Sequence, residues 1–95
     1  MVLGHERCGA VKAATEGGRA PGAIGSILEP IGPSVKAAKE KGGDVAEAAM
    51  RAHVLGMAEG IRKSKPILAE LVEEKRLVVV GARYDLDTGK VEVLE

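Results

Sequence analysis

The stretch Val2-Leu3-Gly4-His5-Glu6-Arg7-Cys8-Gly9-Ala10-Val11 decides how this chain folds, because it joins a short apolar strand to a helix through a turn. It contains the only cysteine of the chain and one of its two histidines. A turn between strand and helix brings His5 and Cys8 together, and an imidazole nitrogen and a thiolate suit a zinc ion. Two ligands are fewer than the three that a zinc site draws from protein.

The pair of His5 and Cys8 also has a purely structural interpretation. A free cysteine often behaves as a small hydrophobic residue, so Cys8 could pack under the following helix while His5 hydrogen-bonds a backbone carbonyl. That helix is predicted over Ala10–Glu16 and ends at Gly17-Gly18. Cys8 would then lie near its N-terminus, where free N–H groups favour a thiolate. From these residues alone, metal binding and simple burial are both open.

The composition fits one small domain over residues 1–95 that associates with another subunit. The apolar content is 45%, yet the chain has one tyrosine and neither Phe nor Trp, so its core buries little area per residue. The 14 basic and 14 acidic residues balance, which indicates neither nucleic acid nor a membrane as a partner. A single cysteine and no signal peptide after Met1 predict a cytoplasmic protein.

Helical patterns fill the middle of the chain. Ser34 is predicted to cap a surface helix that ends near Lys41 and keeps its lysines in solvent. Asp44 and Glu47 form a capping box at the start of the longest helix. One face of this helix is predicted to be buried through four apolar residues at helical spacing, namely Met50, Val54, Met57 and Ile61.

Glycines mark the second half of that long helix, and another helix follows it. Gly56 and Gly60 each cost about 1 kcal/mol relative to alanine, so we expect close packing there against the sheet or another chain. The next helix is predicted to begin at Ser64, with Pro66 in its first turn. Its buried stripe is predicted to consist of Ile67, Leu68, Leu71 and Val72.

The last part of the chain is predicted to form strands. The run Leu77–Val80 is typical of a strand covered on both faces, which Gly81 would close or bulge. Arg83–Leu86 and Lys90–Leu94 flank a turn at Asp87-Thr88-Gly89, where glycine supplies a positive φ for a hairpin. The predicted fold class is therefore α/β, with a mostly parallel sheet, flanking helices and a C-terminal β-hairpin.

The remaining polar residues are assigned structural roles. His53 is expected to be buried or at an interface rather than to bind metal. Glu6 and Arg7 are expected to be solvated or paired with other groups. Four residues of the hairpin are expected to serve turn chemistry or packing, namely Arg83, Tyr84, Asp85 and Asp87.

Three stretches together resemble the β-class carbonic anhydrases. Val2–Val11 resembles the second zinc-ligand motif of that family. Val79-Val80-Gly81-Ala82-Arg83-Tyr84-Asp85-Leu86-Asp87-Thr88-Gly89-Lys90-Val91 is similar to the family's last central strand and terminal hairpin. Pro66-Ile67-Leu68 after Arg62-Lys63-Ser64 is similar to its late helix. The matches occur in the family's order across the whole chain.

The resemblance implies a zinc-dependent enzyme that hydrates CO₂ reversibly to bicarbonate, with His5 and Cys8 as the matching zinc ligands. A complete enzyme of the family begins upstream with a Cys-x-Asp-x-Arg motif, which supplies another zinc cysteine and an Asp-Arg pair. No such motif occurs here. We therefore expect the chain to correspond to the C-terminal half of the family and to lack part of the active site. It would act with copies of itself or with the missing N-terminal half.

Two alternatives follow from the missing ligand. A two-fold interface could bring two copies of His5 and Cys8 together as a closed Cys₂His₂ zinc site, with no position left for hydroxide. The second alternative is a non-catalytic module that derives from the same family and binds zinc or oligomerises.

Overall fold

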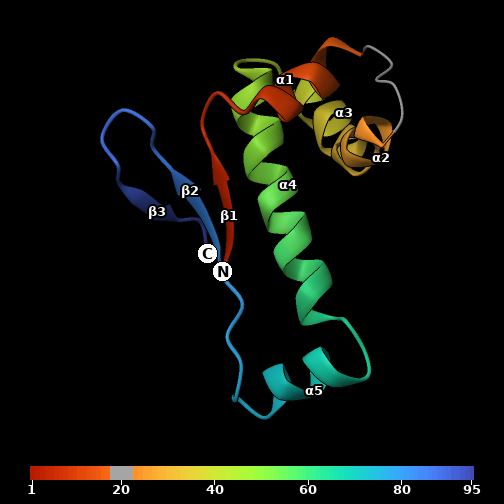
Figure 1. Cartoon of the computed structure of the whole chain (residues 1–95), viewed down its shortest axis with the longest axis vertical. Coiled ribbons are helices and arrows are strands. Elements are labelled where there is room, and N and C mark those ends of the chain that lie inside the picture. The colour runs from red at the N-terminus through yellow and green to blue at the C-terminus, as the bar shows by residue number, and fades with distance from the viewer. Residues whose placement is uncertain (18–22) are drawn as a thin grey trace.

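A small sheet and one long helix beside it organise the structure (Figure 1). The computed structural model describes residues 1–17 and 23–95. Strand β1 (Val2–His5) pairs in parallel with β2 (Gly81–Tyr84), and β2 pairs antiparallel with β3 (Val91–Val93). The strand order is β1-β2-β3, so the sheet is mixed and β2 is its central strand. The predicted α/β fold class is confirmed.

The helices form the long crossover that parallel strands require. In chain order they are α1 (Gly9–Glu16), α2 (Ile24–Leu28), the 3₁₀ helix η1 (Glu29–Ile31), α3 (Gly32–Lys41), α4 (Val45–Arg62) and α5 (Ile67–Glu73). In Figure 1, α1, α2 and α3 gather around the N-terminal half of α4, whereas α5 lies beyond its other end. None of the described helices combines the length and the apolar composition needed to cross a membrane.

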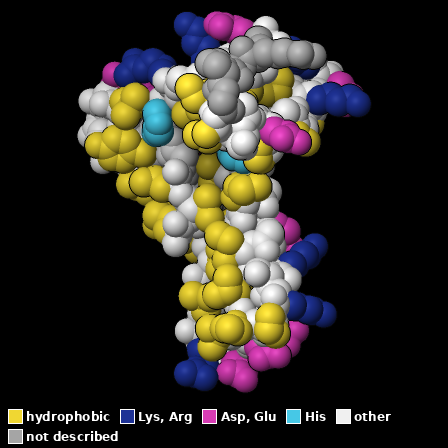
Figure 2. Space-filling view, turned by 45° about the vertical axis from the view of Figure 1, so that its right-hand side comes forward, with side chains coloured by type: hydrophobic (Ala, Val, Ile, Leu, Met, Phe, Trp, Pro, Cys, Tyr) yellow, Lys and Arg dark blue, Asp and Glu magenta, His cyan; other side chains and the backbone are white. Residues whose placement is uncertain are grey.

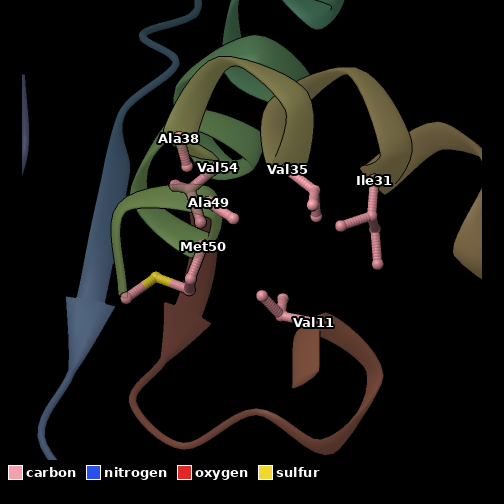
Figure 3. Packing of buried hydrophobic residues seen from close by; sticks show 7 residues of the cluster. All are labelled: Val11, Ile31, Val35, Ala38, Ala49, Met50 and Val54. Atoms are coloured by element: carbon pink, nitrogen blue, oxygen red, sulfur yellow. The ribbon is translucent and has the colours of Figure 1, made fainter. Parts of the chain in front are cut away.

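The hydrophobic core lies where α1, α3 and the N-terminal half of α4 meet. Figure 3 shows its side chains pointing toward one another across the three helices. They are Val11 from α1, Ile31 from η1, Val35 and Ala38 from α3, and Ala49, Met50 and Val54 from α4. Burial of such apolar surface contributes about 25 cal/mol per Å², and it holds α1, with the loop before it, against α4.

Helix α3 differs from its prediction at one end. It ends at Lys41 as predicted, and its lysines are exposed. Its N-cap residue is Ile31 rather than Ser34, and it begins at Gly32, because Pro33 fits the first turn of a helix, where its missing N–H has no partner to lose. Val35 and Ala38 face the core, so α3 is amphipathic.

The start of α4 agrees with half of the predicted capping box. Asp44 Oδ1 accepts a hydrogen bond from the backbone N–H of Glu47 at 3.1 Å, which satisfies one free donor of the helix. The Glu47 side chain does not return this bond. It pairs instead with two arginines, which are described below with the site.

The predicted apolar stripe of α4 is buried only in its N-terminal half. Met50 and Val54 belong to the core, whereas Met57 and Ile61 are 42% and 36% exposed. The strands are three or four residues long and cover only the part of α4 beside them. The exposure of Met57 and Ile61 therefore contradicts the predicted burial.

The glycines of α4 lie in this uncovered half. A methyl group added at Gly56 or Gly60 would meet no described atom within 4 Å. The predicted packing of these glycines against the sheet is therefore wrong, because the sheet does not extend to them. Packing of Gly56 and Gly60 against another chain stays a prediction.

Helix α5 is shorter and more exposed than its pattern suggests. It begins at Ile67, after Pro66, and not at Ser64. Ile67 is 66% exposed and Leu68 is also exposed, so the predicted buried stripe is wrong. The core and the sheet lie around the other end of α4, away from α5 (Figure 1), and Leu71 and Val72 are only half-buried.

The apolar run Leu77–Val80 is extended but is not part of the sheet. The central strand begins at Gly81 instead, and Val78 is 76% exposed. Its parallel neighbour β1 starts at Val2, which lies opposite Gly81 and donates a backbone hydrogen bond to Val80 O at 2.8 Å. The residues before Val80 have no strand opposite them in the described structure, and a β-ladder needs one.

Gly4 is the point of closest approach between β1 and α4. A methyl group there would lie 2.5 Å from Val54 Cγ2 and 2.9 Å from Met50 Sδ. We predict that Gly4→Ala lowers the free energy of unfolding by about 1–3 kcal/mol, because the core must shift to accommodate it. Urea denaturation followed by circular dichroism measures this change.

The matched control is Gly56→Ala on the uncovered part of α4. Alanine is the better helix former, so this substitution should raise the free energy of unfolding by up to about 1 kcal/mol. A Gly4→Ala variant as stable as the wild type would contradict the close packing of β1 on α4.

Candidate functional site

The loop between β1 and α1 holds the two predicted metal ligands. His5 is the last residue of β1, and Cys8 is the N-cap residue of α1 with extended backbone angles. Between them Arg7 has a φ of 52°, a left-handed conformation that is uncommon for a residue other than glycine. The Cys8 carbonyl accepts the first α1 hydrogen bond from Lys12 N–H at 2.9 Å. The backbone therefore passes from β1 into α1 within three residues.

His5 and Cys8 line the same cavity, which has a volume of about 830 Å³. The whole β1–α1 loop forms one side of it. Charged side chains from other elements complete the lining, and they include Lys12 of α1, Glu47 and Arg51 of α4, and Arg83 of β2. The structure thus places the two predicted ligands in one cavity, which charged side chains also line.

The imidazole ring of His5 is held by its own loop. Its Nδ1 lies 2.8 Å from the backbone carbonyl oxygen of Glu6. A carbonyl oxygen only accepts, so Nδ1 is the donor of this bond, and in the neutral ring Nε2 then has a free lone pair. Metal-binding histidines are held in this way, with one nitrogen donating to a carbonyl and the other free for the ion.

Cys8 is a free and half-buried thiol. Together with His5 it offers the nitrogen and sulfur donors that zinc prefers. Within the described residues, the one group of three or more Cys, His, Asp or Glu donors within 4.8 Å of one another is Glu6, Asp85 and Asp87. Neither His5 nor Cys8 belongs to this group. The donor chemistry therefore fits two positions of a zinc site.

Arg83 forms the centre of an ion-pair network in the wall of the cavity. Its Nε donates to Glu47 Oε2 at 2.8 Å and its Nη2 to Glu47 Oε1 at 3.0 Å, a two-point contact that links β2 to α4. Arg51 Nε also donates to Glu47 Oε2, at 2.7 Å, and Arg51 Nη2 donates to Glu92 on β3. Arg83 was expected to pack on the hairpin, where its Nη1 lies 3.7 Å from Asp85 Oδ2. Its two-point contact with Glu47, however, is made on α4 and was not expected.

This network changes the acidity of Glu47. The hydrogen bonds from Arg83 hold the pKa of the Glu47 carboxyl below its ordinary value, with a further contribution from Arg51. Burial of the carboxyl acts in the opposite direction but does not prevail. Glu47 is therefore ionised at neutral pH and cancels part of the positive charge of the two arginines.

Glu6 and Arg7 tie the ligand loop to the turn between β2 and β3. Glu6 Oε1 accepts backbone N–H groups from Leu86 at 2.7 Å and from Asp87 at 3.2 Å. Arg7 Nη2 donates to Asp87 Oδ1 at 3.0 Å. The expectation that Glu6 and Arg7 pair with other groups is confirmed. The sequence carries no local signal for these partners, which lie 80 positions away.

The turn itself is closed by its own residues, as predicted. Asp85 Oδ1 accepts the backbone N–H groups of Asp87 at 2.9 Å and Thr88 at 3.1 Å. These bonds lower the pKa of the Asp85 carboxyl. Gly89 has a φ of 73° and donates its N–H to Asp85 O at 2.8 Å.

His53, on α4, is half-buried and does not line the cavity.

Comparison with known proteins places this geometry in a family. The family model for carbonic anhydrases matches residues 1–91. Carbonic anhydrase 2 of Mycobacterium tuberculosis is 29% identical over 94 residues, which cover 95% of this chain and 45% of the relative. A carbonic anhydrase of Mycolicibacterium smegmatis is 30% identical over 97 residues, which cover 98% of this chain and 47% of the relative.

A solved structure agrees with these sequence matches. It comes from work on two tetrameric β-carbonic anhydrases of the filamentous ascomycete Sordaria macrospora. It matches with a TM-score of 0.75 and 27% identity, over 97% of this chain and 49% of the solved chain. The chain thus belongs to the carbonic anhydrase family, in its β class. It spans about half the length of the curated relatives that it matches.

The ion pair between Glu47 and Arg83 predicts a pH dependence of stability. The pKa of Glu47 is lowered in the folded state, so its contribution is complete above the pKa of an unfolded glutamate, about 4.3. The contribution disappears as the pH falls through the lower folded-state value. We predict that Glu47→Gln lowers the free energy of unfolding at pH 7 by about 1 kcal/mol, and that the difference vanishes well below pH 4.

Urea denaturation at a series of pH values measures this difference. The control is Glu40→Gln, which changes an exposed glutamate of α3. It should leave the stability almost unchanged at every pH. A deficit of Glu47→Gln that stays constant from pH 7 to pH 3 would contradict an electrostatic role of this pair.

Proposed function

We propose that His5 and Cys8 supply two ligands of a zinc site, and that the assembled protein catalyses the reversible hydration of CO₂ to bicarbonate. The observation that carries this proposal is the hydrogen bond of His5. Its Nδ1 donates to the Glu6 carbonyl, so Nε2 is the ring nitrogen left for a metal, and His5 lines a cavity that Cys8 also lines. Membership in the carbonic anhydrase family supports the reaction.

The chain's own residues hold and orient the ligands in this proposal. The bond to the Glu6 carbonyl fixes the tautomer and the rotation of the His5 ring. The N-cap position places Cys8 at the N-terminus of α1, in the lining of the same cavity as His5. When bound, zinc supplies a Lewis acid that makes hydroxide available near neutral pH for addition to CO₂.

The remaining ligands come, we propose, from another copy of the chain or another polypeptide segment. A catalytic zinc site draws three ligands from protein, and the described residues bring two suitable donors together. Residues 18–22 contain no Cys, His, Asp or Glu. An assembly is therefore part of this proposal, and CO₂ and bicarbonate are its small-molecule partners.

An exposed apolar surface supports association with a second copy. Figure 2 shows a stripe of hydrophobic side chains down the part of the molecule that contains the C-terminal half of α4 and α5. The exposed apolar residues of this region are Met57, Ile61, Ile67, Leu68 and Val78. Contiguous apolar surface of this kind typically marks an interface. We call these five residues the distal apolar residues and propose that they meet another copy of the chain.

The zinc content of the purified protein tests the proposed ligands. We expect about one zinc ion per chain by elemental analysis, and its loss in Cys8→Ala, because the thiolate is one of the donors. The control His53→Gln should retain zinc, since His53 does not line the cavity. Wild-type protein that holds no zinc, purified without chelator, would contradict the proposal.

The stoichiometry and the activity together separate the alternatives. About half a zinc ion per chain, without CO₂ hydration, would indicate the closed Cys₂His₂ site shared by two copies. About one zinc ion with turnover in a stopped-flow indicator assay would support the enzyme. Zinc without turnover would support a non-catalytic zinc-binding module.

The oligomeric state tests the distal apolar residues. We predict that Ile67→Glu shifts the wild-type oligomer toward monomer in sedimentation velocity at micromolar concentration, because a charge would be buried at the interface. The control Ile27→Glu places the same charge at a similarly exposed isoleucine of α2 and should leave the oligomer intact. A wild-type chain that sediments as a monomer would refute association through these residues.

A further inference from the structure

We infer that Glu6 is a positioning residue for the proposed zinc site. Its backbone carbonyl orients His5, and its carboxylate fastens the ligand loop to the turn between β2 and β3. Figure 1 shows this loop and this turn at the same end of the sheet. The inference rests on the proposed function, because the ring that Glu6 holds is the proposed zinc ligand.

The carbonyl that holds His5 belongs to the peptide unit between Glu6 and Arg7. Arg7 has a left-handed backbone conformation, so this peptide unit is turned in a way that an isolated loop would rarely adopt. Two contacts hold it from either side. Glu6 N–H donates to Tyr84 O at 3.3 Å, and the Arg7 side chain is bound to Asp87.

The carboxylate of Glu6 adds a charge-assisted connection between loop and turn. The Glu6 side chain is 15% exposed. Oε1 accepts the N–H groups of Leu86 and Asp87, and Oε2 lies 3.4 Å from Arg83 Nη2. Hydrogen bonds to an ionised carboxylate are roughly twice as strong as bonds between neutral groups. The carboxylate thus determines where the backbone of Glu6, and with it the His5 ring, is placed.

The turn that receives Glu6 also has hydrogen bonds of its own. Asp85 closes the turn through the N–H groups of Asp87 and Thr88, and Gly89 donates to Asp85 O. Glu6 is also absent from the hydrophobic core, which lies between α1, α3 and α4. Removal of the carboxylate should therefore release the ligand loop while the turn and the core persist.

The acidic group of Glu6, Asp85 and Asp87 is explained by the same contacts. Its members lie close enough together to suggest a second cation site. Their oxygens, however, already accept the backbone N–H groups of the turn and the guanidinium of Arg7. We therefore interpret this group as the anchor of the ligand loop.

The first test reads the His5 ring directly and needs no metal. Nitrogen-15 NMR of the imidazole should show the Nδ1–H tautomer in the wild type, because Nδ1 donates to a carbonyl. In Glu6→Ala we expect a mixture of the two tautomers. Glu6→Gln keeps an oxygen for the turn N–H groups but loses the charge that faces Arg83, so an intermediate result is expected.

The second test measures metal affinity with cobalt(II) alone, followed by its absorption bands. We expect Glu6→Ala to bind at least about 10-fold more weakly than the wild type, the usual loss when support of a ligating histidine is removed. The control Glu92→Ala removes a carboxylate of the same hairpin that accepts from Arg51 and does not touch the loop. It should match the wild type in both tests.

The outcomes separate the two proposals. A wild type that binds no cobalt contradicts the zinc site, while the tautomer measurement still decides whether Glu6 orients the ring. Unchanged tautomer and unchanged affinity in both Glu6 variants would overturn the role of Glu6. Amide spectra of each variant establish that the core is retained, and Glu6→Gln serves if Glu6→Ala does not fold.

Discussion

The parallel pairing of β1 with β2 is the constraint on which the rest of the structure depends. It places Val2 opposite Gly81 and His5 opposite Tyr84, so segments from both ends of the sequence lie side by side. The ladder fixes where β1 ends, and the ligand loop therefore starts beside the β2–β3 turn. Every contact of Glu6 and Arg7 with that turn follows from this register. A shift of one residue would move the side chains of β1 to the opposite face.

The helices differ in how much they contribute to the packing around these strands. Helices α1, α2 and α3 and the N-terminal half of α4 surround the core, and their packing holds the ligand loop in place. The C-terminal half of α4 and α5 bury little of their apolar surface within the described chain. The molecule thus divides into a packed end, which holds the site, and an end whose apolar side chains remain in solvent. The proposed zinc site and the proposed interface between copies therefore lie at opposite ends of α4.

Features that depend on neighbouring residues were predictable from the sequence. The N-cap at Asp44, the helix end at Gly17 and the turn at Gly89 follow from local hydrogen bonds and backbone angles. Features that depend on what covers an element were not. Leu77–Val80 has the composition of a buried strand but has no strand opposite it in the described structure, and Met57 continues a stripe that the sheet is too short to cover.

The candidate site divides in the same way. The spacing of His5 and Cys8 indicated that one turn brings them together, and both line one cavity. The bond from His5 to a backbone carbonyl was likewise foreseen, as part of a purely structural reading, and the same bond leaves Nε2 free. The partners of Glu6 and Arg83 could not be inferred, because long-range ion pairs leave no periodic pattern in one sequence.

The register of β1 also has a consequence for synthesis of the protein. β1 is made before the helical crossover, and its partner β2 is made after it. The ladder between the two strands therefore cannot form until the whole crossover has been made, and contacts so far apart in sequence form slowly. The helices can form and pack meanwhile, because their contacts are closer in sequence. The ligand loop acquires its contacts with the β2–β3 turn only after that turn has left the ribosome.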